Sequence, residues 1–452
     1  MHITFLGGTE TVTGSKYLLT EDGHRVLIDC GLFQGLKELR LRNWDPFPID
    51  VTSIHHVILT HAHIDHSGYL PLLYRHGFRG KIYCSTGTRD LCEILLPDSA
   101  RLQEEETQYA NKHGYSKHHP ALPLYTMQDA HAVLEHFVAF PYHRSIELAN
   151  HFQFQFQRAG HIIGSSFVQI YSHDKTIVFT GDMGRENDDV MRSRALVNEA
   201  DYLIIESTYG DREHNNINPY DQLADVINRT VERGGTIVIP AFAVGRSQVL
   251  LYYLFLLKQQ KRIPDLPVFL DSPMAVNATE IFIRHQDEHR LTQQEIKGMC
   301  QMAKYAATPE ESKQIDKMNQ PKIIISASGM ITGGRILHHV KRFAPDPKNT
   351  ILFTGYQAVQ TRGARMLNGE REIKILGEMV PINAEIVSLD NVSAHADAIE
   401  ILSWLKQFKR EPQKIFITHG ETVAANALKN RIEKELGWRN CVVPSYLQKE
   451  AL

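Results

Sequence analysis

The chain has 452 residues, of which 42% are hydrophobic and 22% are charged. It is therefore long enough for two domains and has the composition of an ordinary soluble globular protein. The formal net charge of -3 excludes a global attraction to polyanions, so any nucleic-acid surface would have to be a local patch. The five cysteines include no CxxC pair, which favours a reducing compartment and argues against zinc held by cysteine.

The N-terminal segment and the apolar runs of the chain predict a cytoplasmic location. The segment MHITFLGGTETVTGS has neither the basic head nor the apolar core of a signal peptide. The longest clean apolar run, residues 249–257, is about half as long as the roughly 20 residues that a membrane helix needs. We therefore expect a cytoplasmic protein without a membrane segment.

The first 210 residues are predicted to be rich in strands, with helices between two groups of them. Short apolar segments separated by glycines and polar turns predict strands at residues 2–8, 15–21, 25–31 and 55–60. Residues 85–135 have helical spacing, and strands return between residues 136 and 210. Because strand follows strand with few helices at the start, we expect an antiparallel or mixed sheet.

The pattern changes in the middle of the chain. Predicted strands at 236–240, 267–271, 321–328 and 350–356 are each followed by a predicted helix. Four strand–helix units in succession indicate a parallel sheet covered by helices. We therefore expect an α/β protein in which a first domain is formed by residues 1–208 and 386–452, with residues 209–385 inserted as a second domain.

The segment THAHIDHSGYL, residues 60–70, follows an apolar strand and carries His61, His63, Asp65 and His66. His61 and His63 are two residues apart, so in extended chain they project to the same side. Three imidazoles and a carboxylate favour zinc or a similar borderline ion over calcium. Four such side chains exceed what one zinc with an open position for water needs, so a second ion is expected.

Four further candidate residues lie at predicted strand ends. His161 stands in the glycine-flanked segment RAGHIIGSS, and His419 follows a strand in KIFITHGE. Asp182 follows the strand IVFTG, where a carboxylate can bridge two cations. Asp29 ends the strand VLIDCG and is placed to orient a ligand histidine. A single histidine is more often a surface or core residue than a ligand, but a cluster of them is costly unless a metal neutralises it.

The motif H-A-H-I-D-H at residues 61–66, with Asp29 before it and His161 and Asp182 after it, resembles the metallo-β-lactamase superfamily. The resemblance implies an αββα sandwich that holds two metal ions at one edge. It implies that His61, His63 and His161 bind one zinc ion. Asp65, His66 and His419 would bind the other, with Asp182 bridging the pair.

Later motifs resemble the β-CASP ribonuclease branch, which carries an inserted parallel α/β domain. These motifs are LIIEST with Glu206, NVSAHAD with His395, ITHGE with His419, PAFAVGRSQ and SASGMITGGR. Among members, the chain looks most similar to the messenger-RNA 3′-processing endonuclease and its prokaryotic relatives. Histidine in the last motif, here His419, is typical of RNA-acting members. Relatives commonly dimerise, which makes a homodimer a further expectation.

The resemblance implies a two-zinc ribonuclease that acts on single-stranded RNA in RNA processing or decay. A hydroxide activated by both metals would attack phosphorus and leave 5′-phosphate and 3′-hydroxyl ends. Cutting inside the RNA chain is expected, and a 5′ exonuclease mode stays open. Glu206 would hold His395 protonated, so that His395 binds the scissile phosphate or protonates the leaving oxygen. The residues expected to carry the chemistry are Asp65, Asp182, Glu206 and His395.

Two loops of the inserted domain are candidates for binding the RNA backbone. The first runs from a strand through a Ser/Gly loop into a helix and contains Ser328, Gly329 and Arg335. Its backbone N–H groups and helix dipole can receive an anion. The second places Arg246 and Ser247 at a helix start, where arginine suits forked phosphate binding. The alternative for both loops is that their glycines merely permit tight turns.

Three other functions remain open at this point. A DNA nuclease of the same architecture is disfavoured by His419. A small-molecule hydrolase such as a thioesterase or lactamase would not need the large insertion. A non-catalytic RNA-binding scaffold should have lost ligands, whereas every expected metal and acid–base position here carries a suitable residue.

Overall fold

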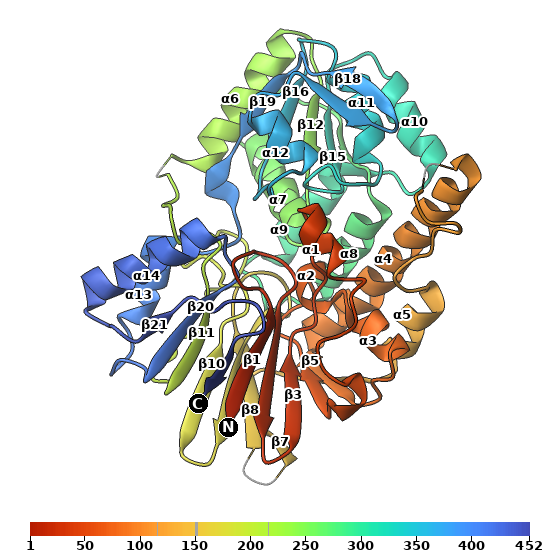
Figure 1. The fold of residues 1–452 in the computed structure, drawn as a ribbon. Helices are drawn as coiled ribbons and strands as arrows, with labels where there is room; N and C mark the ends of the chain where they lie inside the picture. Colours follow the sequence, from red (N-terminus) through yellow and green to blue (C-terminus); the bar gives the residue numbers. More distant parts are fainter. Residues whose placement is uncertain (115, 150–151, 216) are drawn as a thin grey trace. The chain divides into compact units, whose positions relative to one another are not determined.

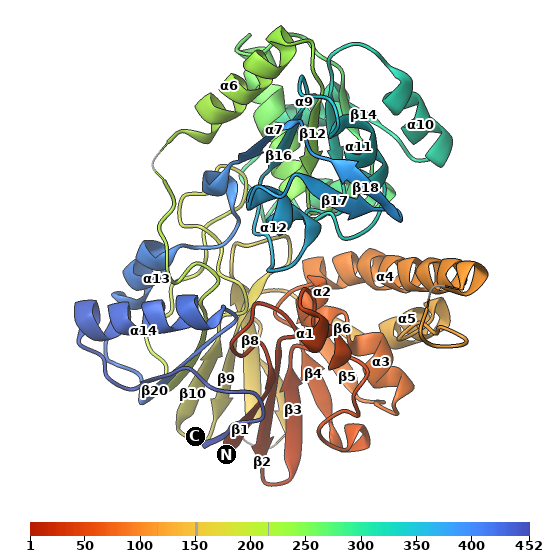
Figure 2. The same cartoon turned by 45° about the horizontal axis from the view of Figure 1, so that its top comes forward.

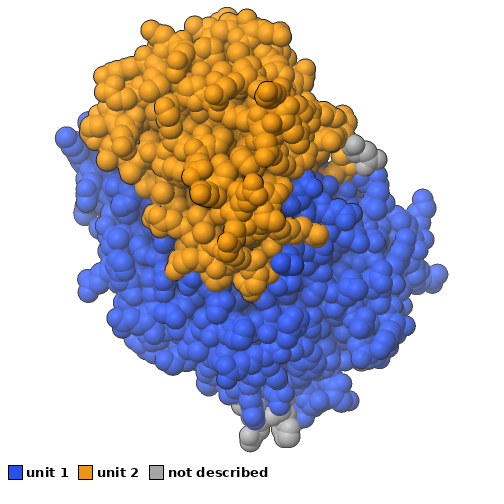
Figure 3. Space-filling model, turned by 180° about the vertical axis from the view of Figure 1, so that it is seen from behind, with its two compact units in different colours: residues 1–213, 395–452 blue, residues 214–394 orange. Residues whose placement is uncertain are grey.

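A computed structural model describes residues 1–114, 116–149, 152–215 and 217–452 of the chain. The described residues fall into two compact units, Met1–Glu213 with His395–Leu452, and His214–Ala394 (Figure 3). The chain thus leaves the first unit and later returns to it. The domain boundaries expected at residues 208/209 and 385/386 stay a prediction.

The first sheet of unit 1 has the strand order β22-β1-β2-β3-β4-β5-β6. Strands β22 to β3 pair antiparallel, and β3 to β6 pair parallel, so the sheet is mixed as predicted. A tight turn at Asp22 and Gly23 joins β2 to β3, whereas the parallel pairs need longer crossovers. The strands are β1 His2–Gly7, β2 Lys16–Glu21, β3 His24–Ile28, β4 His56–Ile58, β5 Lys81–Ser85, β6 Phe137–Phe140 and β22 Lys449–Ala451.

The second sheet has the order β21-β20-β11-β10-β9-β8-β7. Here β20, from the C-terminal part of the chain, pairs parallel with β11, with Glu206 opposite Thr418. This pairing places the ends of β11 and β20 side by side. The strands are β7 Ile146–Ala149, β8 Phe152–Arg158, β9 Ser166–Ser172, β10 Lys175–Phe179, β11 Tyr202–Glu206, β20 Lys414–Thr418 and β21 Cys441–Val442.

The two sheets pack face to face over a shared core that includes Phe5, Phe154, Phe179 and Phe416. The alternation of β8 follows from this, since its phenylalanines point into the core while Gln153 is exposed. Helices α3, α4 and α5 lie against the first sheet, and α13 and α14 against the second (Figures 1 and 2). Unit 1 is therefore the expected αββα sandwich. Its helices are α1 Lys37–Leu41, α2 Ile64–Ser67, α3 Leu70–Arg75, α4 Thr86–His113, α5 Met127–Leu134, α13 Ala398–Leu405 and α14 Thr422–Leu436, with the 3-10 turn η1 Val51–Ser53.

Unit 2 contains a parallel sheet of order β14-β13-β15-β12-β16-β19 and a two-stranded hairpin, β17-β18. Helices α10, α11 and α12 and the hairpin bury one face of the sheet, and α6 and α7 lie toward the other (Figure 2). The strands are β12 Ile237–Pro240, β13 Val268–Leu270, β14 Ala303–Tyr305, β15 Ile323–Ser326, β16 Thr350–Phe353, β17 Glu372–Ile375, β18 Glu378–Pro381 and β19 Glu385–Ser388. The helices are α6 Pro219–Glu232, α7 Arg246–Gln259, α8 Pro273–Arg284, α9 Gln293–Met302, α10 Pro309–Lys317, α11 Ile336–Phe343 and α12 Arg362–Leu367, with the 3-10 turn η2 Asp390–Val392.

The four predicted strand–helix units correspond to β12–α7, β13–α8, β15–α11 and β16–α12. Helix α8 begins three residues before the predicted start at 276, because Ser272 caps it and Pro273 occupies its first position. Among the described residues, no helix is both long and apolar enough to cross a membrane.

Candidate metal centre

The candidate ligands of unit 1 follow the carboxyl ends of strands from both sheets. His61 and His63 come after β4, Asp182 after β10 and His419 after β20. His161 lies in the connection between β8 and β9, where its backbone N–H donates to Ser165 Oγ. Because β10, β11 and β20 are parallel, their carboxyl ends meet at one edge of the second sheet.

The short helix α2 is fixed by the loop that follows β3. Cys30 N–H donates to His66 O at 2.7 Å, and Leu32 N–H donates to Ile64 O at 2.9 Å. Between them, a Cβ on Gly31 would lie 1.6 Å from Asp65 O, so only glycine permits this approach. The loop therefore sets the positions of Asp65 and His66, which α2 carries.

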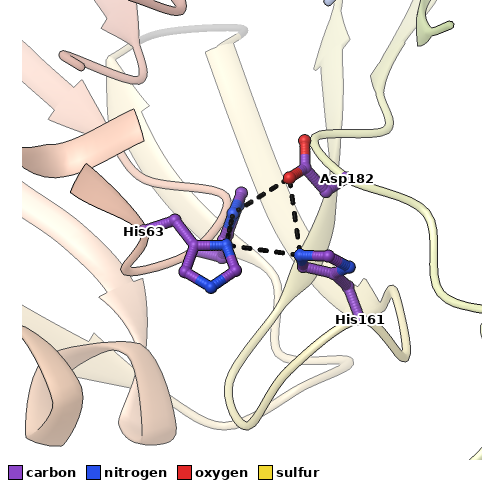
Figure 4. Close-up of side chains that lie close together, drawn as sticks. His63, His161 and Asp182 are labelled. Carbon is purple, nitrogen blue, oxygen red and sulfur yellow. Dashed lines mark hydrogen bonds and ion pairs between the residues drawn. The ribbon is translucent and has the colours of Figure 1, made fainter. Parts of the chain in front are cut away.

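The first cluster consists of His61, His63, His161 and Asp182. His63 Nδ1 lies 3.1 Å from His61 Nε2 and 3.3 Å from His161 Nε2. Asp182 Oδ2 lies 3.3 Å from His61 Nε2 and 3.5 Å from His161 Nε2. Figure 4 shows the rings of His63 and His161 and the Asp182 carboxylate facing one another. One atom from each residue thus lies within 4.8 Å of the others, as a single ion would require.

The second cluster consists of Asp65, His66 and His419. His419 Nε2 lies 3.1 Å from His66 Nε2 and 3.5 Å from Asp65 Oδ2. Asp182 Oδ1 lies 3.2 Å from His66 Nε2, while Asp182 Oδ2 faces the first cluster. The two oxygens of Asp182 are therefore directed at the two clusters, which suits a bridging carboxylate.

Hydrogen bonds on the far side of the rings test whether the second cluster suits a metal. His66 Nδ1 lies 2.8 Å from Asp29 Oδ2, and His419 Nδ1 lies 3.1 Å from Thr208 Oγ1. When both Nδ1 atoms donate, the two Nε2 atoms face each other with lone pairs at 3.1 Å. With the protons so placed, Asp182 Oδ1 is buried without a hydrogen-bond donor among the described residues, although His66 Nε2 lies only 3.2 Å away. A cation satisfies all three atoms, and the nitrogen and oxygen donors suit zinc.

The pKa shifts favour neutral ligands in the first cluster. Burial lowers the pKa of His61 to about 3, with repulsion from His66 adding to the effect. Burial likewise lowers the pKa of His63 to about 4 and that of His161 well below its usual range. Neutral imidazoles are the form that binds metal.

Around the second cluster, neighbouring charges outweigh the effect of burial on the pKa values. Burial alone would lower the pKa of His66, but the charges of Asp182 and Asp29 raise it well above its usual range. Burial would raise the pKa of Asp182, but the charges of His419 and His66 hold it well below its usual range. A metal ion must therefore compete with a proton at His66.

The buried Glu206 and the partly buried His395 form a pair beside the first cluster. His395 Nδ1 lies 3.2 Å from both carboxylate oxygens of Glu206, which is 1% exposed. The His395 ring centroid lies 4.4 Å from that of His161, and His395 Nε2 lies 3.9 Å from Asp182 Oδ2. Although burial opposes it, the charge of Glu206 raises the pKa of His395 to about 9.

Asp29, directly after β3, lies behind the ring of His66, a candidate ligand, and its role in orienting that ligand stays a prediction. Besides His66, it accepts hydrogen bonds from Thr60 N and Thr60 Oγ1, each at 2.8 Å. The sequence interpretation missed Thr60 and also Thr208. The available signal was a hydroxyl side chain directly beside the motifs, in T-H-A-H and in E-S-T.

The five candidate phosphate-binding residues lie in unit 2, where several have structural partners. Ser328 Oγ accepts from Thr332 N at 3.0 Å and Gly333 N at 3.4 Å. Arg335 donates to Asp271 Oδ1 at 2.6 Å, to Ala306 O at 3.0 Å and to Ala307 O at 2.7 Å. These contacts hold the loop between β15 and α11.

Phe242 connects that loop to the second one. A Cβ on Gly329 would lie 2.8 Å from the Phe242 ring, so close packing accounts for this glycine. Ser247 Oγ donates to Phe242 O at 2.8 Å, and Arg246 is buried at the start of α7. The structure thus brings the two loops together, and their contact with phosphate stays a prediction.

Three family models match the chain. They are the beta-lactamase superfamily domain at residues 24–233, the Beta-Casp domain at residues 247–366, and the Zn-dependent metallo-hydrolase RNA specificity domain at residues 379–444. Together they match most of both units described above.

Similar proteins include a ribonuclease and a termination factor. Ribonuclease TTHA0252 of Thermus thermophilus is 35% identical over 434 residues, which is 93% of each chain. Transcription termination factor FttA of Methanosarcina mazei is 33% identical over 458 residues, or 96% of this chain and 69% of that protein. A solved structure, a protein of unknown function from Enterococcus faecalis V583, covers 100% of this chain and 99% of its own with a TM-score of 0.54. At 12% identity, this last match is a likeness of fold alone.

Proposed function

Because the chain belongs to the β-CASP ribonuclease branch of the metallo-β-lactamase superfamily, we propose that it is a metal-dependent ribonuclease that cuts within single-stranded RNA. The strongest support from outside the structure is the match to a ribonuclease over 93% of both chains. The observation that carries the proposal is the pair of donor clusters that share Asp182.

Two zinc ions would occupy the clusters, with three histidines at the first and Asp65, His66 and His419 at the second. Bound there, they would supply Lewis-acid chemistry that activates water and offsets the phosphate charge. Asp182 keeps the two sites adjacent because one oxygen faces each. Asp29 orients His66, and its second contact fixes Thr60 beside His61.

Glu206 and His395 handle the proton and the phosphate. Glu206 receives the Nδ1–H of His395, so the ring presents Nε2 toward the first cluster. From there His395 holds the scissile phosphate or gives a proton to the leaving 3′ oxygen as the bond from phosphorus to that oxygen breaks. The products would carry 5′-phosphate and 3′-hydroxyl ends.

The backbone of the RNA would be held in part by the two loops of unit 2. The segment from Ser328 to Arg335 precedes α11, and Arg246 begins α7. Backbone N–H groups and arginine together suit phosphate oxygens. This role adds affinity for RNA without contributing to bond cleavage.

The test is a cleavage panel with the purified chain on single-stranded RNA, duplex DNA and a thioester, each with and without a chelator. We expect cutting of RNA only, loss of cutting with EDTA, and recovery on addition of zinc. Mass analysis of the fragments identifies the ends. Preferential cleavage of DNA would favour the DNA nuclease, and RNA binding without cleavage would favour the scaffold. Chelator-resistant cutting would remove the metal mechanism.

A further inference from the structure

The carboxylate of Glu206 contacts a second histidine through a threonine. Thr208 Oγ1 lies 2.6 Å from Glu206 Oε2 and 3.1 Å from His419 Nδ1. The hydroxyl thus stands between the partner of His395 and a ligand of the second cluster. Thr208 is 4% exposed, so water does not compete for these bonds.

The positions of the protons follow from the distances. The single hydroxyl proton of Thr208 goes to its nearest acceptor, Glu206, rather than to His419 O at 3.3 Å. The hydroxyl lone pair then accepts the Nδ1–H of His419. This leaves His419 Nε2 unprotonated, and this atom faces His66 and Asp65. The alternative acceptor for Nδ1, Asp182 Oδ1, is more distant at 3.4 Å.

The carboxylate of Asp29 makes the same kind of contacts, with one histidine and one threonine hydroxyl. Asp29 Oδ2 contacts His66 Nδ1 directly at 2.8 Å and also accepts from Thr60 Oγ1 at 2.8 Å. Thr60 Oγ1 in turn lies 3.1 Å from His61 Nδ1. Each carboxylate therefore contacts one histidine directly and is connected to a second histidine through a threonine hydroxyl. The two sets come from different sheets, since β3 and β4 provide one and β11 and β20 the other.

The neighbouring residue, Ser207, already provides the structural contacts of this turn. Ser207 already joins the ends of β11 and β20, because its Oγ donates to Thr418 O at 2.8 Å and its N–H donates to His419 O. The turn is thus held without the hydroxyl of Thr208. The hydroxyl of Thr208 instead determines which ring nitrogen of His419 carries the proton.

We propose that Thr208 is a positioning residue that fixes the tautomer of His419 for the second metal ion and links that ion's site, through Glu206, to His395. The inference deepens the proposed function and rests on it for the role of His395. Thr60 has the equivalent task for His61 in the first cluster. Loss of the Thr208 hydroxyl should therefore affect the second ion and spare the first.

The experiment compares Thr208→Val, which keeps the shape, with Thr208→Ser, which keeps the hydroxyl. Thr60→Val and Thr60→Ser form the matched pair at the first cluster, and His419→Gln marks loss of the second ion. The zinc affinity of each variant of the 452-residue chain is measured by competition with a chromophoric chelator. We expect Thr208→Val to weaken the second zinc roughly 10- to 100-fold, as loss of a partner behind a ligand does. Thr208→Ser should keep both affinities, and Thr60→Val should weaken the first zinc.

Three results would overturn the proposal. They are unchanged zinc affinity in Thr208→Val, equal weakening in Thr208→Ser and Thr208→Val, and equal weakening of both ions by Thr208→Val. RNA cleavage by the unchanged protein is measured in parallel. If that protein binds two zincs and cuts no RNA, the proposed function fails while the zinc result still decides the role of Thr208.

Discussion

At the scale of single residues, His395 is distinguished from the candidate metal ligands by its partner, Glu206. Its Nδ1 contacts Glu206 and its Nε2 lies 3.9 Å from Asp182 Oδ2, so we propose that Nε2 acts as a proton donor rather than as a metal ligand. We expect His395→Gln to retain both zincs and to lower kcat about 10²- to 10⁴-fold, the usual contribution of a positioned acid. Elemental analysis and single-turnover RNA cleavage check the two parts. Turnover close to that of the unchanged protein would remove His395 from the mechanism.

Asp182 and Asp65 should differ in how many ions they hold. One oxygen of Asp182 faces each cluster, whereas Asp65 belongs to the second cluster, where it contacts His419. Asp182→Asn is therefore expected to lose both ions, and Asp65→Asn only the second, each with loss of cleavage. Zinc content after gel filtration measures this. Two ions retained by Asp182→Asn would contradict the bridging role.

The residue types of the clusters could be predicted from the sequence because His61 to His66 stand together in one segment. The hydroxyl contacts could not. Thr208 and His419 are 211 positions apart, and their contact depends on which strands pair and on the direction of a small side chain. A pattern of residue types contains neither fact.

At the scale of elements, α10, α11 and the end of β13 meet at a buried histidine of unit 2. His339 Nε2 lies 2.7 Å from Asp271 Oδ2, and His339 Nδ1 lies 2.7 Å from Asp316 Oδ1. The Asp271 carboxylate also accepts hydrogen bonds from Arg335 and Ser312. Although burial opposes it, these carboxylates raise the pKa of His339, so its charged form stabilises the fold.

Because folding raises the pKa of His339, the full stabilisation is present below the unfolded pKa of about 6.5. It is lost as the pH rises through the pKa of the folded state. We expect His339→Gln to lower the free energy of unfolding by roughly 3 kcal/mol at pH 6, as breaking a buried pair does, and by less at pH 9. Urea unfolding at both pH values measures this. His338→Gln, on the exposed side of α11, is the control. An effect of His339→Gln that is equal at both pH values would contradict the assignment.

The loop at the start of α7 gives a prediction for RNA affinity. If Arg246 contacts a phosphate, Arg246→Ala should weaken RNA binding at every sequence. It should also reduce the slope of log affinity against log salt by about 0.7, the value for one contact on a single strand. Fluorescence anisotropy at several salt concentrations measures both. An unchanged slope would assign Arg246 to packing alone.

Strand–helix alternation sufficed to predict the four main units of the sheet in unit 2, since each has a clear apolar strand followed by a helical segment. It did not predict β14, β19 or the β17–β18 hairpin. The two hairpin strands lack a continuous apolar run, since only Ile373 and Ile375 are buried in β17 and only Val380 in β18. Their place is decided by packing on other elements, as for the hairpin residues in the core of unit 2.

At the scale of the whole molecule, the two candidate ligand clusters combine residues that follow strands of both sheets of unit 1. Residues after β4 of the first sheet meet residues after β10 and β20 of the second. The pairing of β11 with β20, some 200 residues apart, brings Glu206 and His419 to one edge. No local pattern predicts such a pairing, so this part of the fold followed only from the family resemblance.

The central claim is that two metal ions lie on either side of Asp182. Anomalous diffraction at the zinc edge from crystals of the zinc-loaded protein tests it most directly. We predict two peaks, one among His61, His63 and His161 and one among Asp65, His66 and His419, with the Asp182 carboxylate between them. A single peak, or none in protein that cleaves RNA, would contradict it.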